Sequence, residues 1–151
     1  MMTTIPRPDL AARPHQLSVE RDMAASSAAL YEAWTERFDA WFAAPGTVLM
    51  RGEVDEAFFF EVHFGGERYP HYGRFLALDP GRYVELTWVT GAGGTKGAET
   101  VVSVELMPHG TGTRLRLTHA GFPDEETAKQ HADAWPEVLA QLDKRLMGAA
   151  H

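Results

Sequence analysis

The sequence contains no cysteine among its 151 residues. This absence excludes disulfides, thiolate-bound zinc, iron–sulfur clusters and cysteine nucleophiles. No apolar run approaches the ~20 residues that a helix needs to cross a bilayer. Residues 1–16 carry arginine and proline but lack the apolar core of a secretion signal. We therefore expect a cytoplasmic protein with no membrane insertion and with a flexible N-terminal tail over residues 1–16.

Basic residues are also scarce, because 14 lysines and arginines stand against 21 aspartates and glutamates, for a formal net charge of −7. A nucleic-acid partner is therefore not expected, since binding to phosphates needs a basic face. Hydrophobic residues make up 44% and charged residues 23% of the chain, which is ordinary for a globular protein. The length suits one domain, which we place at residues 17–147.

The centre of the chain alternates apolar and polar residues with the two-residue period of β-strands. Phe58, Phe60 and Val62, for example, alternate with Phe59 and Glu61. Strands are expected at residues 17–23, 47–54, 58–64, 69–78, 83–88, 100–106 and 114–119. The pattern leaves open which face of the 69–78 strand lies inward.

Helical periods flank this region. A helix is expected over residues 24–34, capped by Ser26 or Ser27, and a second short helix follows through Phe38 and Trp41. A long helix is expected from about residue 124 to 147. Its apolar stripe consists of Ala128, Ala132, Trp135, Leu139, Leu142 and Leu146. Strands grouped apart from helices indicate an α+β fold with an antiparallel sheet, and a cavity forms beneath the long helix if that sheet curves.

Several short motifs match a known family. They are Ala33-Trp34-Thr35 with Trp41-Phe42, Gly73-Arg74-Phe75 through Leu86-Thr87-Trp88, and Leu117-Thr118-His119 with Gly121-Phe122, His131, Trp135 and Leu139. On these motifs the chain resembles the heat-shock-protein-90 ATPase activator homologue family of the START-like (Bet v 1-like, SRPBCC) superfamily. The resemblance implies a helix-grip fold, in which a curved antiparallel sheet wraps around a long C-terminal helix, with two short helices after the first strand and a hydrophobic cavity. Superfamily members bind lipids and hormones, cyclise polyketides, hydroxylate with partner domains or assist a chaperone, so the resemblance does not select one function.

The chain has seven histidines. None has the spacing of a helical metal motif, so neither a metal site nor a cofactor is expected. His63 shares a strand face with Glu61 and should be solvated. His119 ends the inward face of the last strand and His131 lies on the helix stripe, so both are candidate catalytic residues, because paired imidazoles can act as acid and base near neutral pH. The alternative is that each makes a structural hydrogen bond at the rim of a pocket.

The leading functional hypothesis is a cavity that binds a hydrophobic or aromatic metabolite or a lipid-like molecule. Its expected lining is Trp34, Phe38, Trp41, Phe60, Phe75, Trp88, His119, Phe122, His131, Trp135 and Leu139. The first alternative is an enzyme of the cyclase or dehydratase type that uses His119 and His131. The second alternative is an interaction protein, either a chaperone regulator or a homodimer, which an exposed edge strand at residues 47–54 and an acidic surface would serve.

Overall fold

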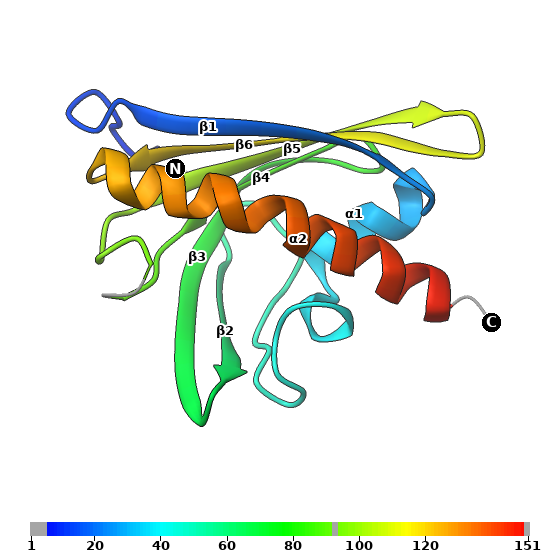
Figure 1. The fold of residues 1–151 in the computed structure, drawn as a ribbon, viewed down its shortest axis with the longest axis horizontal. Helices are drawn as coiled ribbons and strands as arrows, with labels where there is room; N and C mark the ends of the chain where they lie inside the picture. The colour runs from blue at the N-terminus through cyan, green and yellow to red at the C-terminus, as the bar shows by residue number, and fades with distance from the viewer. Residues whose placement is uncertain (1–5, 92–93, 150–151) are drawn as a thin grey trace, which may run out of the picture.

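A curved antiparallel sheet wraps around one side of a long C-terminal helix (Figure 1). The computed structural model describes residues 6–91 and 94–149. The strands are β1 (His15–Met23), β2 (Ala57–Phe64), β3 (Glu67–Asp79), β4 (Tyr83–Trp88), β5 (Thr100–His109) and β6 (Gly112–Phe122), in the order β1-β6-β5-β4-β3-β2. The helices are α1 (Ser27–Thr35), the short 3-10 helix η1 (Phe38–Ala40) and α2 (Glu125–Ala149). This architecture confirms the predicted α+β helix-grip fold.

The alternation in the sequence corresponds to burial along the strands. In β6, Leu115, Leu117 and His119 point inward and are buried, as their shared parity predicts. In β3 the inward residues are His71 and Phe75, both of which are buried. The structure thus decides the orientation of β3 that the sequence left open.

The N-terminal segment contacts the sheet. β1 begins at His15, two residues before the predicted start, and pairs with β6 along its length. Ahead of β1, the guanidinium of Arg13 donates hydrogen bonds to the carbonyl oxygens of Gly121 and Glu99, both at 2.7 Å. Of the tail that we predicted over residues 1–16, the first five residues lie outside the described part of the chain.

The long strand β3 changes partner along its length, and this bends the sheet. Residues 67–74 pair with β2, whereas residues 75–79 pair with β4. Gly73 stands at the change of partner, where an added Cβ would lie 2.2 Å from the carbonyl oxygen of Thr87. Only glycine allows so close an approach of two backbones. The β2–β3 hairpin therefore projects away from the other strands, as Figure 1 shows.

The segment 47–54 is a loop, so the strand predicted there is wrong. It meets β2 at one antiparallel bridge, in which Leu49 and Phe59 exchange backbone hydrogen bonds of 2.8 and 2.9 Å. The hydroxyl of Thr47 accepts a further bond from the N–H of Glu61 at 3.1 Å. These contacts cover the outer edge of β2, which removes the exposed edge strand that the interaction hypothesis relied on.

Aromatic rings fill the space between α1, η1 and the sheet. Phe38 stacks on Phe60 with ring centroids 4.7 Å apart, and Trp41 lies 5.0 Å from both Phe38 and Trp34. The indole N–H of Trp41 donates to the carbonyl oxygen of Ala33 at 2.9 Å, so its polar atom is satisfied within the core. This end of the interior is packed with side chains, and a ligand cavity has to lie elsewhere along α2.

The helix α2 closes the open face of the sheet. It begins after Asp124, whose carboxylate accepts a hydrogen bond from the N–H of Thr127 at 2.8 Å, and it continues through Pro136 as one helix. Trp135 and Leu139 of its apolar stripe are buried against the sheet side. Neither α2 nor any other helix in the described part of the chain is long and apolar enough to span a membrane.

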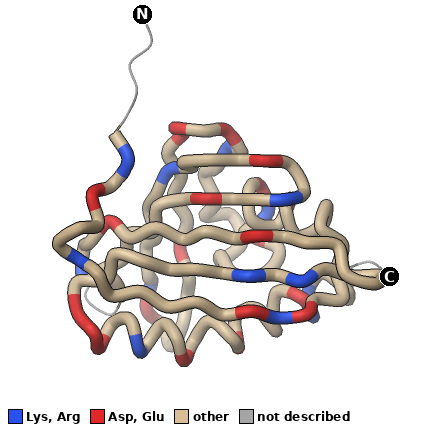
Figure 2. The backbone as a smooth tube through the Cα atoms, turned by 90° about the horizontal axis from the view of Figure 1, so that it is seen from above, with Lys and Arg blue, Asp and Glu red and all other residues tan. Residues whose placement is uncertain are grey.

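Residues of both charge signs lie on neighbouring strands of the sheet, as Figure 2 shows along the backbone. Arg114 of β6 contacts Glu20 and Asp22 of β1 at 2.7 and 3.0 Å. These pairs are exposed and add little to stability, but they intersperse the charges and favour solubility. The net negative charge is therefore not concentrated into one acidic surface on these strands.

A buried carboxylate ties the end of α2 to the start of α1. Asp143 accepts hydrogen bonds from the backbone N–H groups of Ala24 and Ala25, both at 2.9 Å. Ser26, the next residue, caps α1 by accepting from the N–H of Ala29 at 3.1 Å. The carboxylate thus satisfies two donors in the link between β1 and α1.

Substitution Asp143→Ala should destabilise the protein by about 3 kcal/mol, because two charge-assisted bonds are lost and buried N–H groups are left without partners. Urea denaturation followed by circular dichroism measures this change. Asp133→Ala, at an exposed position of the same helix, is the control and should change stability by less than about 0.5 kcal/mol. Equal effects of the two substitutions would refute a structural role for the Asp143 carboxylate.

Candidate functional site

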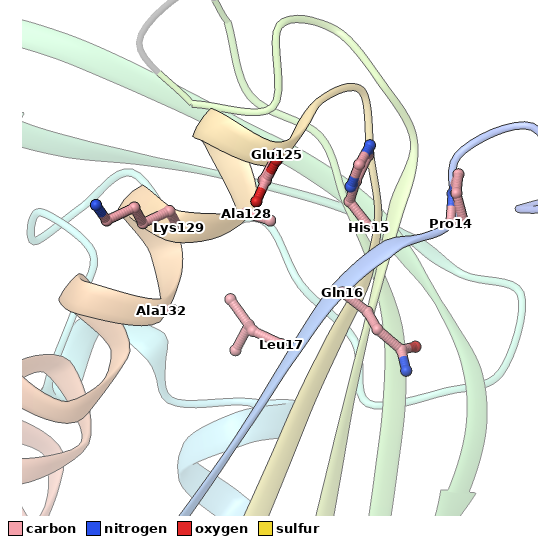
Figure 3. A pocket seen from close by; sticks show the side chains of 8 residues that line it. All are labelled: Pro14, His15, Gln16, Leu17, Glu125, Ala128, Lys129 and Ala132. Atoms are coloured by element: carbon pink, nitrogen blue, oxygen red, sulfur yellow. The ribbon is translucent and has the colours of Figure 1, made fainter.

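One hollow beside α2 is a surface groove. It lies between the start of β1 and the first turns of α2 and has a volume of about 590 Å³ (Figure 3). It is lined by Pro14, His15, Gln16, Leu17, Glu125, Ala128, Lys129 and Ala132. Most of these residues are exposed, and several are polar or charged. Such a lining suits water better than an apolar ligand.

A larger cavity of about 840 Å³ lies between the middle of α2 and the β2–β3 hairpin. Apolar and aromatic side chains dominate its wall. The lining residues are His131, Ala134, Trp135 and Val138 from α2, Val62, Phe64, Arg68, Tyr69, Pro70 and His71 from the hairpin, and Phe42, Trp88, Thr90, Gly91 and Gly94. The cavity therefore occupies the space left where the hairpin bends away from the remaining sheet.

The loop after β4 forms one side of this cavity and is fixed at its base. The N–H of Thr90 donates to the hydroxyl oxygen of Thr95 at 2.9 Å, and the N–H of Thr95 donates to the hydroxyl oxygen of Thr90 at 2.7 Å. Lys96 pairs with Asp124, the residue before α2, at 2.9 Å. The described ends of this loop are thus joined to each other and to the start of α2.

His119 lies behind the cavity wall with both ring nitrogens hydrogen-bonded. The indole N–H of Trp135 donates to Nδ1 at 3.1 Å, and Nε2 lies 2.7 Å from the hydroxyl oxygen of Thr100. Because an indole only donates, Nδ1 carries the lone pair and Nε2 carries the proton. The Thr100 hydroxyl accepts the hydrogen bond from the Nε2–H group and donates a hydrogen bond of its own to the carbonyl oxygen of Trp88 at 2.5 Å. His119 is consequently a neutral structural group.

His131 and His71 line the cavity, and each has one ring nitrogen hydrogen-bonded to the backbone. Nδ1 of His131 lies 2.8 Å from the carbonyl oxygen of Thr127, and Nδ1 of His71 lies 2.9 Å from that of Tyr69. A carbonyl only accepts, so both Nδ1 atoms carry the proton and both Nε2 atoms carry the lone pair. Neither Nε2 has a hydrogen-bonding partner among the described residues, and no group of three or more His, Asp or Glu side chains there could hold a metal ion.

Burial keeps these imidazoles neutral. It lowers the pKa of His119 well below its usual range, with a further lowering by nearby His131. Burial likewise lowers the pKa of His71 to about 4, against the opposing hydrogen bond to Tyr69. The pKa of His131 is lowered by its burial as well, with the bond to Thr127 acting in the other direction. The cavity thus presents hydrogen-bond acceptors without charge at neutral pH.

The residues predicted to line a ligand fall into two groups in the structure, one in the cavity wall and one in the packed core. Trp88, His131 and Trp135 line the cavity. The remainder form the packed core behind it and are at most 2% exposed: Trp34, Phe38, Trp41, Phe60, Phe75, His119, Phe122 and Leu139. The predicted acid–base pair is close in space, since the rings of His119 and His131 lie 5.2 Å apart, but it does not share the cavity.

Sequence reasoning missed His71, which lines the cavity and is 8% exposed. Its parity with Phe75 was a usable signal, because it placed both residues on one face of the strand. Phe42, Val62 and Val138 were also missed as lining residues. Nothing in their spacing separates a wall position from a core position.

Stability should fall as these histidines are forced to accept protons. The histidine pKa is about 6.5 in the unfolded chain and lower in the folded protein. The neutral, buried histidine therefore contributes its full stability above about pH 6.5, and this contribution is lost as the pH falls towards the pKa of the folded state. For His71, the free energy of unfolding should drop by about 2 kcal/mol between about pH 7.5 and about pH 5. In His71→Phe this part of the drop should vanish, as urea titrations at the two pH values would show. His63→Phe, at an exposed position, should leave the drop unchanged, and an unchanged drop in His71→Phe would contradict the expectation.

Solved structures share this fold. The AHSA1 protein from Silicibacter pomeroyi is 23% identical, with a TM-score of 0.74 over 90% of this chain and 99% of that one. Protein CV1439 from Chromobacterium violaceum is 22% identical, with a TM-score of 0.73 over 87% and 96%. CalU16 from Micromonospora echinospora is 22% identical, with a TM-score of 0.62 over 87% and 75%. Comparison with curated proteins gives no match in sequence.

At these identities the neighbours show the fold alone, and the family follows from the sequence. The model of the family described as Activator of Hsp90 ATPase homolog 1-like protein matches residues 24–147. That range runs from the end of β1 to the last turn of α2 and contains every motif on which we based the resemblance. The chain therefore belongs to the Activator of Hsp90 ATPase homolog 1-like family and has its START-like, helix-grip fold.

Proposed function

We propose that the protein binds an apolar small molecule in the cavity between α2 and the β2–β3 hairpin. The observation that carries the proposal is the cavity of about 840 Å³ with a mainly apolar wall. Binding sites for small molecules typically have volumes of roughly 300–1,000 Å³ and apolar or aromatic walls with a few polar groups. The indole rings of Trp88 and Trp135, whose centroids lie 5.6 Å apart, are each 3% exposed and contribute apolar atoms to the wall.

The state of His119 makes binding the better proposal than acid–base catalysis by His119 and His131. A catalytic imidazole has to reach the substrate and exchange a proton with it. His119 has no exposed surface, and both its nitrogens are occupied by Trp135 and Thr100. Its role in the proposal is to hold Trp135 in the cavity wall.

Regulation of a chaperone ATPase is the activity that the family description names. In this sequence, the interaction hypothesis depends on an exposed edge strand at residues 47–54 and on an acidic surface. That segment is a loop bonded to Phe59 and Glu61 of β2, so strand pairing with a partner is not supported at this edge. The cavity remains the feature with the clearest chemistry.

A large side chain placed in the cavity should weaken binding. Ala134→Trp places an indole at a cavity-lining position of α2 and should weaken the binding of naphthalene at least about tenfold. Ala132→Trp, two residues away at the surface groove, is the matched control and should bind as the wild type does. Ligand-observed NMR and isothermal titration measure the affinities, and thermal unfolding checks that both variants fold. Equal binding by the two variants, or no binding by the wild type, would overturn the proposed function.

A further inference from the structure

Two neutral imidazole nitrogens in the apolar cavity indicate what a ligand should offer. His71 is 92% buried, as its 8% exposure implies, and His131 is half-buried, yet neither Nε2 has a protein partner among the described residues. Both Nε2 atoms keep some accessible surface, since neither belongs to the fully buried polar atoms that lack a partner, so water can bond to them. A ligand that displaces this water without donating a hydrogen bond leaves the acceptors unpaired, which is unfavourable. A cavity that retains two such acceptors is therefore better matched by a ligand that donates than by a plain hydrocarbon.

The tautomers of these histidines are fixed by the backbone. Thr127 lies four residues before His131, so its helical carbonyl oxygen faces Nδ1 of that ring at 2.8 Å. Tyr69 lies two residues before His71 on the same face of β3, and its carbonyl oxygen is 2.9 Å from Nδ1. Each carbonyl retains the proton on Nδ1, and each lone pair is thereby left on the opposite side of its ring.

The other polar side chains of the wall belong to Arg68, Tyr69 and Thr90, and Tyr69 is 42% exposed. The lining residue with a permanent charge is Arg68, which is exposed. Thr90 accepts from the N–H of Thr95, and its hydroxyl hydrogen can donate as well. The low pKa values of both histidines, about 4 for His71, are consistent with rings that accept hydrogen bonds rather than carry charge.

We propose that the natural ligand is an uncharged aromatic or alicyclic compound with a hydroxyl or N–H group, which donates to Nε2 of His71 or His131. This inference rests on the proposed function and adds the chemical class of the ligand. An ether or a hydrocarbon of the same shape leaves the acceptors unpaired, and sites built to bond a hydroxyl reject analogues that lack it. A carboxylate brings a further acceptor to the cavity, and among the lining residues its charge would be met only by Arg68, at the exposed edge, or by an imidazole that becomes charged.

A matched set of naphthalenes tests the inference. At about pH 7.5, where the histidines are neutral, wild-type protein should bind 2-naphthol about tenfold more tightly than 2-methoxynaphthalene, the difference that one well-formed hydrogen bond makes. It should bind 2-naphthoate more weakly than 2-naphthol. Isothermal titration gives the three dissociation constants. Equal affinities for 2-naphthol and 2-methoxynaphthalene would overturn the inference, as would a preference for 2-naphthoate.

Variants assign the preference to the two rings. In the double variant His71→Phe/His131→Phe the ratio of the two affinities should fall to about one, while binding of 2-methoxynaphthalene persists. His63→Phe, an exposed histidine outside the cavity, is the control and should keep the wild-type ratio. A double variant that folds and keeps the hydroxyl preference would refute the inference.

A measurement on the wild type covers the case in which the double variant does not fold. Long-range ¹H–¹⁵N spectra should show Nδ1–H tautomers for His71 and His131 and an Nε2–H tautomer for His119. Adding 2-naphthol should shift an Nε2 resonance of His71 or His131, and adding 2-methoxynaphthalene should not. If both compounds bind without such a shift, the inference fails and the proposed function stands. If neither compound binds, the proposed function fails with it.

Discussion

A chain of hydrogen bonds from α2 to the centre of the sheet determines the shape of the interior. The indole of Trp135 donates to His119, the imidazole donates to Thr100, and the hydroxyl donates to the carbonyl oxygen of Trp88. Each group is buried, so breaking one bond would leave a polar atom unpaired in an apolar environment. The chain therefore fixes the distance between α2 and β4. It also holds both tryptophan rings in the wall of the cavity.

The cavity results from a difference between the two ends of the sheet. Near α1 the strands stay close to the helix, and large rings such as Phe38 and Trp41 fill the interior. At the other end the close approach of backbones at Gly73 turns the β2–β3 hairpin away. Of the four α2 residues that line the cavity there, two are small, namely Ala134 and Val138. Where the sheet bends away from these two side chains, a space remains that none of the described residues fills.

Periodicity predicted the architecture, because alternation and helical stripes report which side of an element is buried. It failed at residues 47–54, where Val48 and Met50 pack against the core from a loop and imitate a strand. It also could not place the cavity. Parity puts Phe75 and His71 on one face of the strand, but it does not show that the space beside Phe75 is filled while the space beside His71 is open. That distinction depends on the bend of the sheet, which arises from contacts distant in sequence.

Imidazole is well suited to provide an acceptor in such a place. A carboxylate in an apolar cavity raises its own pKa and becomes a donor, whereas a buried imidazole lowers its pKa and keeps its lone pair. The remaining ambiguity of a neutral imidazole is its tautomer, and in both His71 and His131 a carbonyl within four residues removes it. The geometry of a strand and the geometry of a helix thus each orient one acceptor towards the same space. Local backbone structure, rather than a network of other side chains, specifies the polar part of this site.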